Sequence, residues 1–327
     1  MFFASAGLAT AAAGGYARFV RAPKSLQSFQ RISWALGSQV SITALHADQG
    51  VAEEAVHAAF AELELVESLL SIYRDDSLLS QLNRTGSVKT PHPYLVEVLR
   101  AAARMSRRSA GAFDVTVQPL WDLAARANEQ GTVPTGSQVA AARESVDWRR
   151  VVVQSGHIQL GGRGTAITLN GIAQGFATDK ATATLRRHGV RQALIDAGEI
   201  NALGTKQGGM PWTIGIQHPR QPDAYLSLAS LQNRCLATSG DYATTFGNDF
   251  QRHHIFDPRS GFSPSMLASV SVAAPTAMEA DALSTAVFVM GPERGLRLIH
   301  ESPGADALLV LKDGRSLSTR HFPRTTS

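Results

Sequence analysis

The sequence predicts an α+β fold in which antiparallel strands pack against helices. Apolar side chains alternate with period two over residues 32–45, which is typical of a strand, and recur at helical spacing over residues 51–72. Residues 151–160 and 307–319 each hold two short apolar runs joined by a turn, which predicts hairpins and hence antiparallel pairing. No internal repeat or long linker interrupts these elements, so any second domain is expected to be interwoven with the first.

Composition is that of a folded globular chain. Of 327 residues, 44% are hydrophobic and 18% are charged, so long disordered tracts are not expected. The net charge of +4 is mild, and no basic face with interleaved aromatics suggests a nucleic-acid partner. Cys235 is the single cysteine, which excludes an internal disulfide and any multi-cysteine zinc or iron–sulfur site. The histidines form no metal-binding pair of the His-x-x-x-His type.

The N-terminal stretch resembles the apolar part of an export signal. Residues 1–15 carry no charge and are rich in Ala and Gly, but they are too short to span a bilayer. We expect residues 1–22 to be an export leader whose basic part lies upstream of the given start, with no lipobox cysteine after it. The protein is then expected to be periplasmic, soluble and not itself transmembrane. A flexible cytoplasmic tail is the alternative.

The other elements follow in order along the chain. The strand at 32–45 is expected to break at Leu36-Gly37, and the helix at 51–72 leads into a polar loop beginning near Tyr73. Further strands are expected at 165–169, 193–204 and 212–216. Helical patterns recur at 93–108, at 172–188, and within 121–148 on both sides of a loop at 131–136.

Residues 275–291 should form one helix of about four turns. Thr276 and Glu279 have the spacing of a capping box, and Gly291, followed by a proline, provides the end. The apolar side chains between them give this helix a buried stripe.

Three polar residues on this helix stand out from that apolar background. Asp281, Ser284 and Thr285 occupy positions i, i+3 and i+4, which lie side by side on a helix surface. One carboxylate and two hydroxyls are hard oxygen ligands suited to Mg²⁺. The alternative is an ordinary first turn, in which Asp281 is favoured by the helix dipole and the hydroxyls bond back to carbonyls.

Two other stretches carry residues with chemical potential. The segment 170–175, Asn-Gly-Ile-Ala-Gln-Gly, places two glycines near a helix N-terminus, where free amides attract phosphate. A glycine-rich helix entry that permits close packing is the alternative. His254 is expected at a strand end beside the turn 257–261, where it could act as a general base. For His253 we expect an ordinary surface or hydrogen-bonded core role.

Taken together, these stretches resemble the ApbE family of Mg²⁺-dependent FAD:protein FMN transferases. The resemblance covers residues 32–312, within an expected domain at 32–320, and seven motifs that are weak alone arrive in the family's order. They are Leu-Gly-Ser at 36–38, Tyr-Arg-Asp-Asp-Ser at 73–77 with Leu-Asn at 82–83, Gly-Ala-Phe-Asp at 111–114, Leu-Asn-Gly-Ile-Ala-Gln-Gly-Phe-Ala-Thr-Asp at 169–179, Ala-Thr-Ser-Gly-Asp-Tyr at 237–242, His-Ile-Phe-Asp-Pro-Arg-Ser-Gly at 254–261 and Ala-Asp-Ala-Leu-Ser-Thr at 280–285.

The resemblance implies a fold of mixed, largely antiparallel sheets packed with helices in interwoven subdomains. The implied activity moves the FMN half of FAD onto a Ser or Thr of an acceptor protein as a phosphoester and releases AMP. FAD is then a substrate, and the partner is an acceptor flavoprotein, expected to be a membrane-associated redox protein.

The resemblance also implies the roles of individual residues. His254 matches the histidine that activates the acceptor hydroxyl. The residues implied to hold Mg²⁺ are Asp281, Ser284, Thr285 and, through its carbonyl, Gly171. The residues implied to line FAD are Leu36, Tyr73, Ala112, Phe113, Asp114, Thr168, Gln174 and Ile255.

The chain departs from the family pattern at two charged positions. Thr168 and Gln174 stand where the family often has Asp and Lys, so one charge of each sign is lost, and Leu36 stands where Met is common. Two other functions therefore stay open. With water as the acceptor, the same site would be an FAD pyrophosphatase that yields FMN and AMP. Without turnover, the protein would be a flavin-binding carrier.

Overall fold

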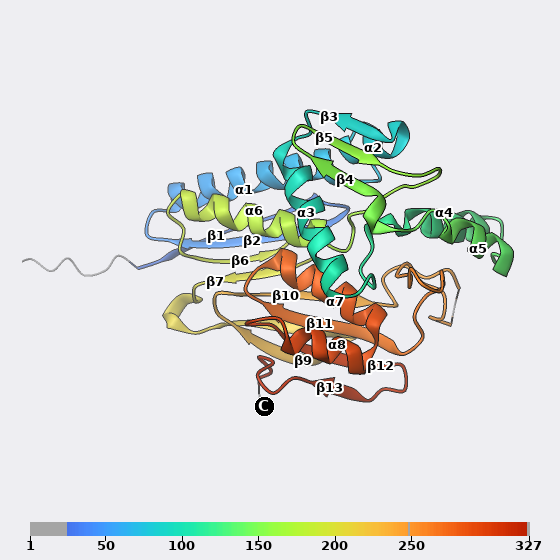
Figure 1. Cartoon of the computed structure of the whole chain (residues 1–327). Helices are drawn as coiled ribbons and strands as arrows, with labels where there is room; N and C mark the ends of the chain where they lie inside the picture. The colour runs from blue at the N-terminus through green and yellow to red at the C-terminus, as the bar shows by residue number, and fades with distance from the viewer. Residues whose placement is uncertain (1–24, 248, 326–327) are drawn as a thin grey trace, which may run out of the picture.

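The computed structural model describes residues 25–247 and 249–325 (Figure 1). Its centre is an eight-stranded sheet whose recorded strand pairs are all antiparallel. In spatial order its strands are β1 (Gln27–Ala35), β2 (Ser38–His46), β6 (Gln192–Asp196), β7 (Ile200–Leu203), β10 (Arg234–Gly240), β11 (Leu267–Ala274), β12 (Asp306–Leu311) and β13 (Ser316–Ser318). The predicted α+β class with largely antiparallel sheets is confirmed. The expected export leader lies outside the described residues.

Two small sheets and eight α-helices complete the described part of the chain. The small sheets contain β3 (Ser87–Lys89), β5 (His157–Leu160) and β4 (Val151–Gln154) in that order, and β8 (Trp212–His218) with β9 (Gln221–Leu231). The helices are α1 (Gln49–Leu70), α2 (Leu78–Thr85), α3 (Pro93–Arg108), α4 (Gln118–Glu129), α5 (Gly136–Arg143), α6 (Ala173–Arg187), α7 (Ala277–Met290) and α8 (Pro292–His300). Among the described helices, none has the length and apolar content that a membrane crossing requires.

The large sheet is buried on both faces. Alternate residues of β11 and β12 point to opposite sides, as the strand period requires. Val270 and Leu309 join the core under the helices, whereas Ala273 and Leu308 join a second core under the β8–β9 hairpin. β11 is therefore buried along its whole length, which fixes its register against β10 and β12.

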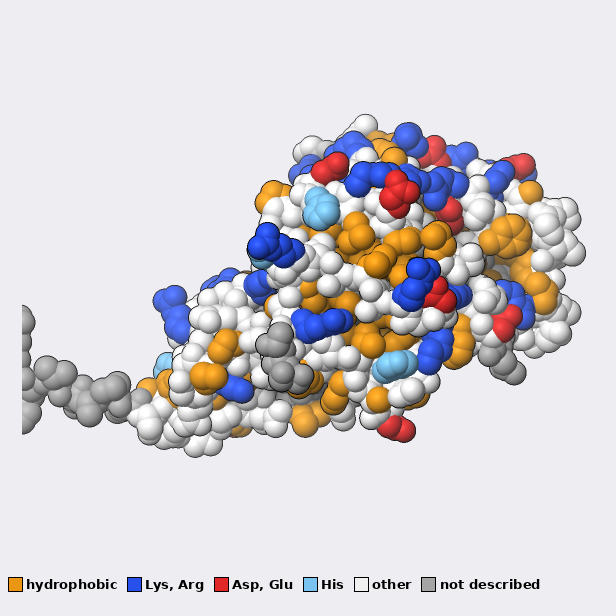
Figure 2. All heavy atoms as spheres, turned by 90° about the horizontal axis from the view of Figure 1, so that it is seen from below, with side chains coloured by type: hydrophobic (Ala, Val, Ile, Leu, Met, Phe, Trp, Pro, Cys, Tyr) orange, Lys and Arg blue, Asp and Glu red, His pale blue; other side chains and the backbone are white. Residues whose placement is uncertain are grey.

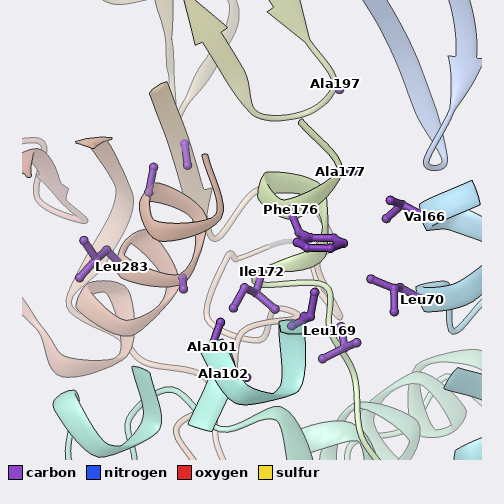
Figure 3. Packing of buried hydrophobic residues seen from close by; sticks show 14 of the residues in the cluster. Val66, Leu70, Ala101, Ala102, Leu169, Ile172, Phe176, Ala177, Ala197 and Leu283 are labelled. Carbon is purple, nitrogen blue, oxygen red and sulfur yellow. The ribbon is translucent and has the colours of Figure 1, made fainter. Parts of the chain in front are cut away.

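The helix layer converges on the first turn of α6. Figure 3 shows the Phe176 ring pointing from α6 toward Val66 and Leu70 of α1, with Ile172 near Ala101 of α3. Phe176 and Ile172 are both almost fully buried, so the chain entering α6 is held on several sides by apolar packing. On the surface seen from below, hydrophobic side chains lie in groups interspersed with Lys and Arg (Figure 2).

Two stretches predicted as single strands are hairpins. The stretch 32–45 folds back at Leu36 and Gly37, whose φ values of 53° and 73° match a two-residue turn between antiparallel strands. The stretch 193–204 folds back between β6 and β7, with Gly198 at φ 88°. Its turn was missed because Ala197 within it is buried, so the apolar pattern continues through the bend.

The strand predicted at 165–169 is absent from the described secondary structure. In its place an asparagine side chain pairs with the backbone: Asn83 Nδ2 donates to the Ile167 carbonyl at 2.8 Å, and Ile167 N–H donates to Asn83 Oδ1 at 2.8 Å. The Asn83 side chain therefore makes the two hydrogen bonds to Ile167 that the backbone of a neighbouring strand would otherwise make. The helices predicted at 93–108, 172–188 and 275–291 are confirmed as α3, α6 and α7, as are the hairpins β4–β5 and β12–β13.

Candidate active site

The site is built where α6 and α7 pack against each other. Gly175, in the first turn of α6, lies so close to α7 that a Cβ there would overlap the Ala277 carbonyl. Only glycine permits this approach. Both helices begin here, so two helix N-termini, whose first amides have no partner within their own helix, lie side by side. The close-packing interpretation of the glycines near the start of α6 is therefore correct for Gly175.

Each helix supplies a carboxylate to the N-terminus of the other. Asp281 Oδ2 accepts a hydrogen bond from the Gly175 amide at 3.0 Å. In return, Asp179 on α6 accepts from the amides of Ala277 at 2.8 Å and Met278 at 3.0 Å. This exchange fixes the position of Asp281 relative to the turn that precedes α6. Within α7, Thr276 caps the helix through the Glu279 amide, as predicted.

The predicted oxygen ligands Asp281, Ser284 and Thr285 lie about one turn apart on α7. Asp281 is 3% exposed, and burial raises the pKa of its carboxyl to about 7. Ser239 on β10 lies between the two hydroxyls, at 2.8 Å from Ser284 Oγ and 3.1 Å from Thr285 Oγ1. Ser284 also donates to the Asp281 carbonyl at 2.9 Å. Its hydroxyl therefore has protein partners on two sides, whereas Thr285 extends toward the start of α6.

Gly171 meets Thr285 across this junction. A Cβ built on Gly171 would lie 2.9 Å from Thr285 Oγ1, so the turn backbone rests directly on the threonine side chain. Among the described residues, no group of three or more His, Cys, Asp or Glu side chains could hold a metal. A cation here would therefore need hydroxyl and carbonyl oxygens beside Asp281. The oxygen donors present fit Mg²⁺, and a buried carboxylate with a raised pKa is a site where a cation would favour the ionised form.

The turn before α6 gathers several residues implied to line FAD. The Phe113 ring lies against Gly171, and Thr168 N–H donates to the carbonyl of Val115, which follows the 111–114 motif. The Tyr73 hydroxyl accepts from Asn170 Nδ2 at 3.1 Å, and its ring is 70% exposed. Segments from three separate parts of the chain therefore meet around one turn.

Asp114 is held inside this group. Its carboxylate accepts from Thr116 N–H and Oγ1 at 2.8 and 2.6 Å, and from Trp148 N–H at 3.0 Å. Burial raises the pKa of Asp114 despite these bonds. Its oxygens are thus occupied in ordering the loop, which keeps the neighbouring Ala112 and Phe113 buried at its base.

Three other implied FAD residues have contacts elsewhere. Leu36 N–H donates to Glu67 Oε2 at 3.0 Å, so it belongs to the β1–β2 turn and the end of α1. The Gln174 amide lies against Gly198 in the β6–β7 turn. Ile255 is buried in the loop after β10. The described contacts of these three residues do not join them directly to the group around Gly171.

His254 lies in that loop and not at a strand end, so the expected position was wrong. Its Nδ1 is 3.2 Å from the Thr244 carbonyl, to which it donates, and this leaves Nε2 as a proton acceptor. Burial lowers the pKa of His254, which keeps the ring neutral near pH 7. The predicted chemistry of a base is therefore compatible with its surroundings.

The comparison with known proteins identifies the family. The ApbE family model matches residues 36–309. A curated relative from Treponema pallidum, named FAD:protein FMN transferase, is 35% identical over 80% of this chain and 79% of its own length. The chain belongs to the ApbE family.

Solved structures of the ApbE family share the fold. The ApbE protein of Thermotoga maritima superposes with a TM-score of 0.83 at 28% identity, covering 91% of this chain and all of that one. The flavinyl transferase ApbE of Pseudomonas stutzeri gives a TM-score of 0.78 at 30% identity, covering 90% and 95%. An Escherichia coli relative, also named FAD:protein FMN transferase, is 29% identical over 81% of this chain and 79% of its own length.

Sequence reasoning missed three residues of this ApbE site. Asp179 and Ser239 were visible in the motifs, but their partners on α7 lie far away in the sequence and no local pattern predicts such pairs. No sequence pattern marked Glu199 as a residue of the site. It is 6% exposed, its Oε2 has no hydrogen-bond partner among the described residues, and burial and the nearby Asp281 raise its pKa well above the usual value.

Proposed function

We propose that this ApbE-family protein transfers the FMN half of FAD to a Ser or Thr hydroxyl of an acceptor protein in a Mg²⁺-dependent reaction. The acceptor oxygen forms a bond to the FMN phosphorus, the phosphoanhydride bond to AMP breaks, and the hydroxyl proton leaves to a base. The curated relatives carry this activity in their names. The observation that supports it most directly is the buried Asp281 placed where two helix N-termini meet.

The protein's own groups would hold the metal and the diphosphate. Asp281, Thr285 and the Gly171 carbonyl provide the oxygens, and Ser284 supports Thr285 through Ser239. When bound there, Mg²⁺ would neutralise charge on the transferring phosphate and stabilise the AMP leaving group. The N-terminus of α6, which directly follows the Gly171 turn, would favour the same anionic group through its helix dipole.

His254 is proposed to accept the hydroxyl proton at Nε2. Its Nδ1–H bond to the Thr244 carbonyl fixes the tautomer that leaves Nε2 free, and its lowered pKa keeps it unprotonated at neutral pH. Tyr73 is proposed to lie against a ring of FAD, since it is exposed yet held at its hydroxyl by Asn170. Positioning and electrostatics would supply most of the rate increase.

The loss of charge at Thr168 and Gln174 does not remove the metal ligands. Thr168 keeps its backbone bond to Val115, and its hydroxyl accepts from Asn170 N–H at 3.3 Å. We propose that FAD binds at this same turn through hydrogen bonds from Thr168 and Gln174, at the positions where the family often has a charged Asp and Lys. We propose that Leu36, Ala112, Phe113, Asp114 and Ile255 complete the FAD site.

We also propose that the reaction takes place in the periplasm on a membrane-associated redox protein. The support is the signal-like composition of residues 1–22. The test of location is a fusion to alkaline phosphatase, which is active only after export, of the segment from the upstream in-frame start codon through residue 40. Active fusions support the proposal, and inactive fusions with detectable protein contradict it.

The activity test separates transfer from hydrolysis and from simple binding. The protein is incubated with FAD and MgCl₂, with or without membrane proteins from cells lacking it. AMP is measured by chromatography, and flavin fluorescence is read from a denaturing gel. Transfer predicts AMP together with a fluorescent band. AMP without a band indicates an FAD pyrophosphatase, and FAD binding without AMP indicates a carrier.

Two variants test the proposed roles. Asp281→Asn should abolish Mg²⁺-dependent AMP release, and His254→Gln should lower the transfer rate roughly 100-fold or more, the range typical of a lost general base, with FAD affinity retained. Asp223→Asn, at an exposed position near the start of β9, is the control. Wild-type AMP release by either site variant would remove that residue from the mechanism.

A further inference from the structure

A groove lined by arginines lies between α3 and β4, and its residue Trp148 adjoins the proposed FAD site, since Trp148 N–H donates to Asp114. It encloses about 500 Å³ and contains both charged and apolar side chains. Its charged lining consists of Arg100, Arg104, Arg107 and Arg149. In the described part of the chain, the three α3 arginines form no ion pair, whereas Arg149 pairs with Asp147 at 3.3 Å. The groove therefore has at least three uncompensated positive charges.

The three α3 arginines lie along one helix face. Their spacing of four and then three residues places them on the same side of α3, about 10 Å apart from first to last. Alternate side chains of an extended chain repeat about every 6.6 Å. A strand with acidic residues at alternate positions would therefore meet successive guanidinium groups. The Trp148 ring, with the Arg149 guanidinium 4.7 Å from its centroid, also lines the groove.

The opposite wall offers a free strand edge. β4 is the outer strand of its sheet, in the order β3-β5-β4. The two-residue turn between β4 and β5 makes Gln154 and His157 a bonded pair, so the N–H and C=O of Val153 point away from β5. Val151 and Val153 both line the groove. Unpaired edge groups are the usual site at which an extended peptide is added to a sheet.

We propose that this groove binds an acidic, extended segment of a partner protein, which adds to the edge of β4 and pairs its carboxylates with the arginines of α3. The occupant is a peptide because the charges lie beside a strand edge, whose N–H and C=O groups match the donors and acceptors of a peptide backbone, whereas a lipid headgroup could use only the N–H groups. The proposal does not depend on the flavin chemistry, since binding is measured without FAD.

The test uses a fluorescein-labelled decapeptide of alternating Glu and Ser, with alternating Gln and Ser as the neutral control. Fluorescence anisotropy should show binding of the acidic peptide alone, weakening as NaCl rises because the charges are exposed. The double variant Arg100→Glu/Arg104→Glu should weaken binding roughly tenfold or more, since it removes two ion pairs and adds repulsion. Arg191→Glu, an exposed arginine outside the groove, is the matched control and should bind normally.

A second variant tests the strand edge. Val153→Pro removes an outward-facing amide, a change that edge strands tolerate, and it should weaken the peptide several-fold while circular dichroism stays unchanged. Absence of acidic-peptide binding, or equal binding by the double variant and wild type, overturns the proposal. Loss of binding in the double variant but not in Val153→Pro overturns strand addition. Binding to phosphatidylglycerol vesicles without binding to the peptide would identify a membrane surface instead and also overturns it.

Discussion

The buried His253 should make the stability of the protein depend on pH. The side chain is 0% exposed and packs edge-on against Phe288 of α7, with ring centroids 5.4 Å apart. Its Nδ1 accepts from Ile255 N–H at 3.3 Å, and its Nε2–H donates to the Pro264 carbonyl at 3.1 Å. Only the neutral ring can accept at Nδ1, so protonation of His253 would break the bond from Ile255 N–H while the bond to the Pro264 carbonyl could remain. His253 is therefore the hydrogen-bonded core residue that the sequence suggested, and it anchors the loop that carries His254.

The magnitude follows from the shift in pKa. Burial lowers the pKa of His253 from 6.5 to about 4, opposed by the hydrogen bond to the Pro264 carbonyl and by Asp241 and helped by the neighbouring His254 and Lys312. The folded-state pKa is below the unfolded one, so the stabilisation is complete above pH 6.5 and is lost as the pH falls toward 4. At 1.36 kcal/mol per pKa unit, the folded state loses about 3 kcal/mol of stability over this range.

The assay compares wild type with His253→Gln, whose amide can donate and accept but cannot take up a proton. Urea denaturation at pH 7, 6, 5 and 4 gives the free energy of unfolding of each. Acidic groups titrate in both proteins, so the difference between them isolates His253. Wild type should lose about 3 kcal/mol relative to the variant between pH 7 and 4. A difference that stays constant across this range would refute the reasoning, as would an imidazole titration by NMR with a midpoint near 6.5.

Two further substitutions test the frame of the site. Gly175→Ala should lower the free energy of unfolding by roughly 3 kcal/mol, because its Cβ would overlap the Ala277 backbone. Gly136→Ala, in open space at the start of α5, is the control and should be close to neutral. Equal melting temperatures of the two variants would contradict the close contact at Gly175. Asp241→Asn should also lower the free energy of unfolding by roughly 3 kcal/mol. The buried Asp241 carboxylate accepts hydrogen bonds from Arg220 at 2.7 and 2.8 Å and lies 3.4 Å from Lys312, and the substitution would leave these cations without their partner. The exposed Asp76→Asn is its control in urea denaturation, and matching curves for the two would show that the buried pair contributes nothing.

Local sequence determined the elements whose pattern is complete within a short stretch. Thr276, Glu279 and Gly291 define α7 by their own chemistry, because capping depends on residues three or four positions apart. The same helical spacing brought Asp281 and Thr285 to one region of α7. The motif order was sufficient to identify the family, although no single motif was specific.

Only the tertiary structure decided how these parts meet. The hydrogen bonds of Asp281 with Gly175, and of Asp179 with Ala277, join helices about 100 residues apart, and no local pattern encodes such pairing. The same is true of Asn83, whose side chain replaces a strand beside Ile167. Sequence periodicity reports which side chain is buried but not what it contacts. The candidate residues could therefore be named from the sequence. Only the fold showed that the N-termini of α6 and α7 meet and bring these residues together.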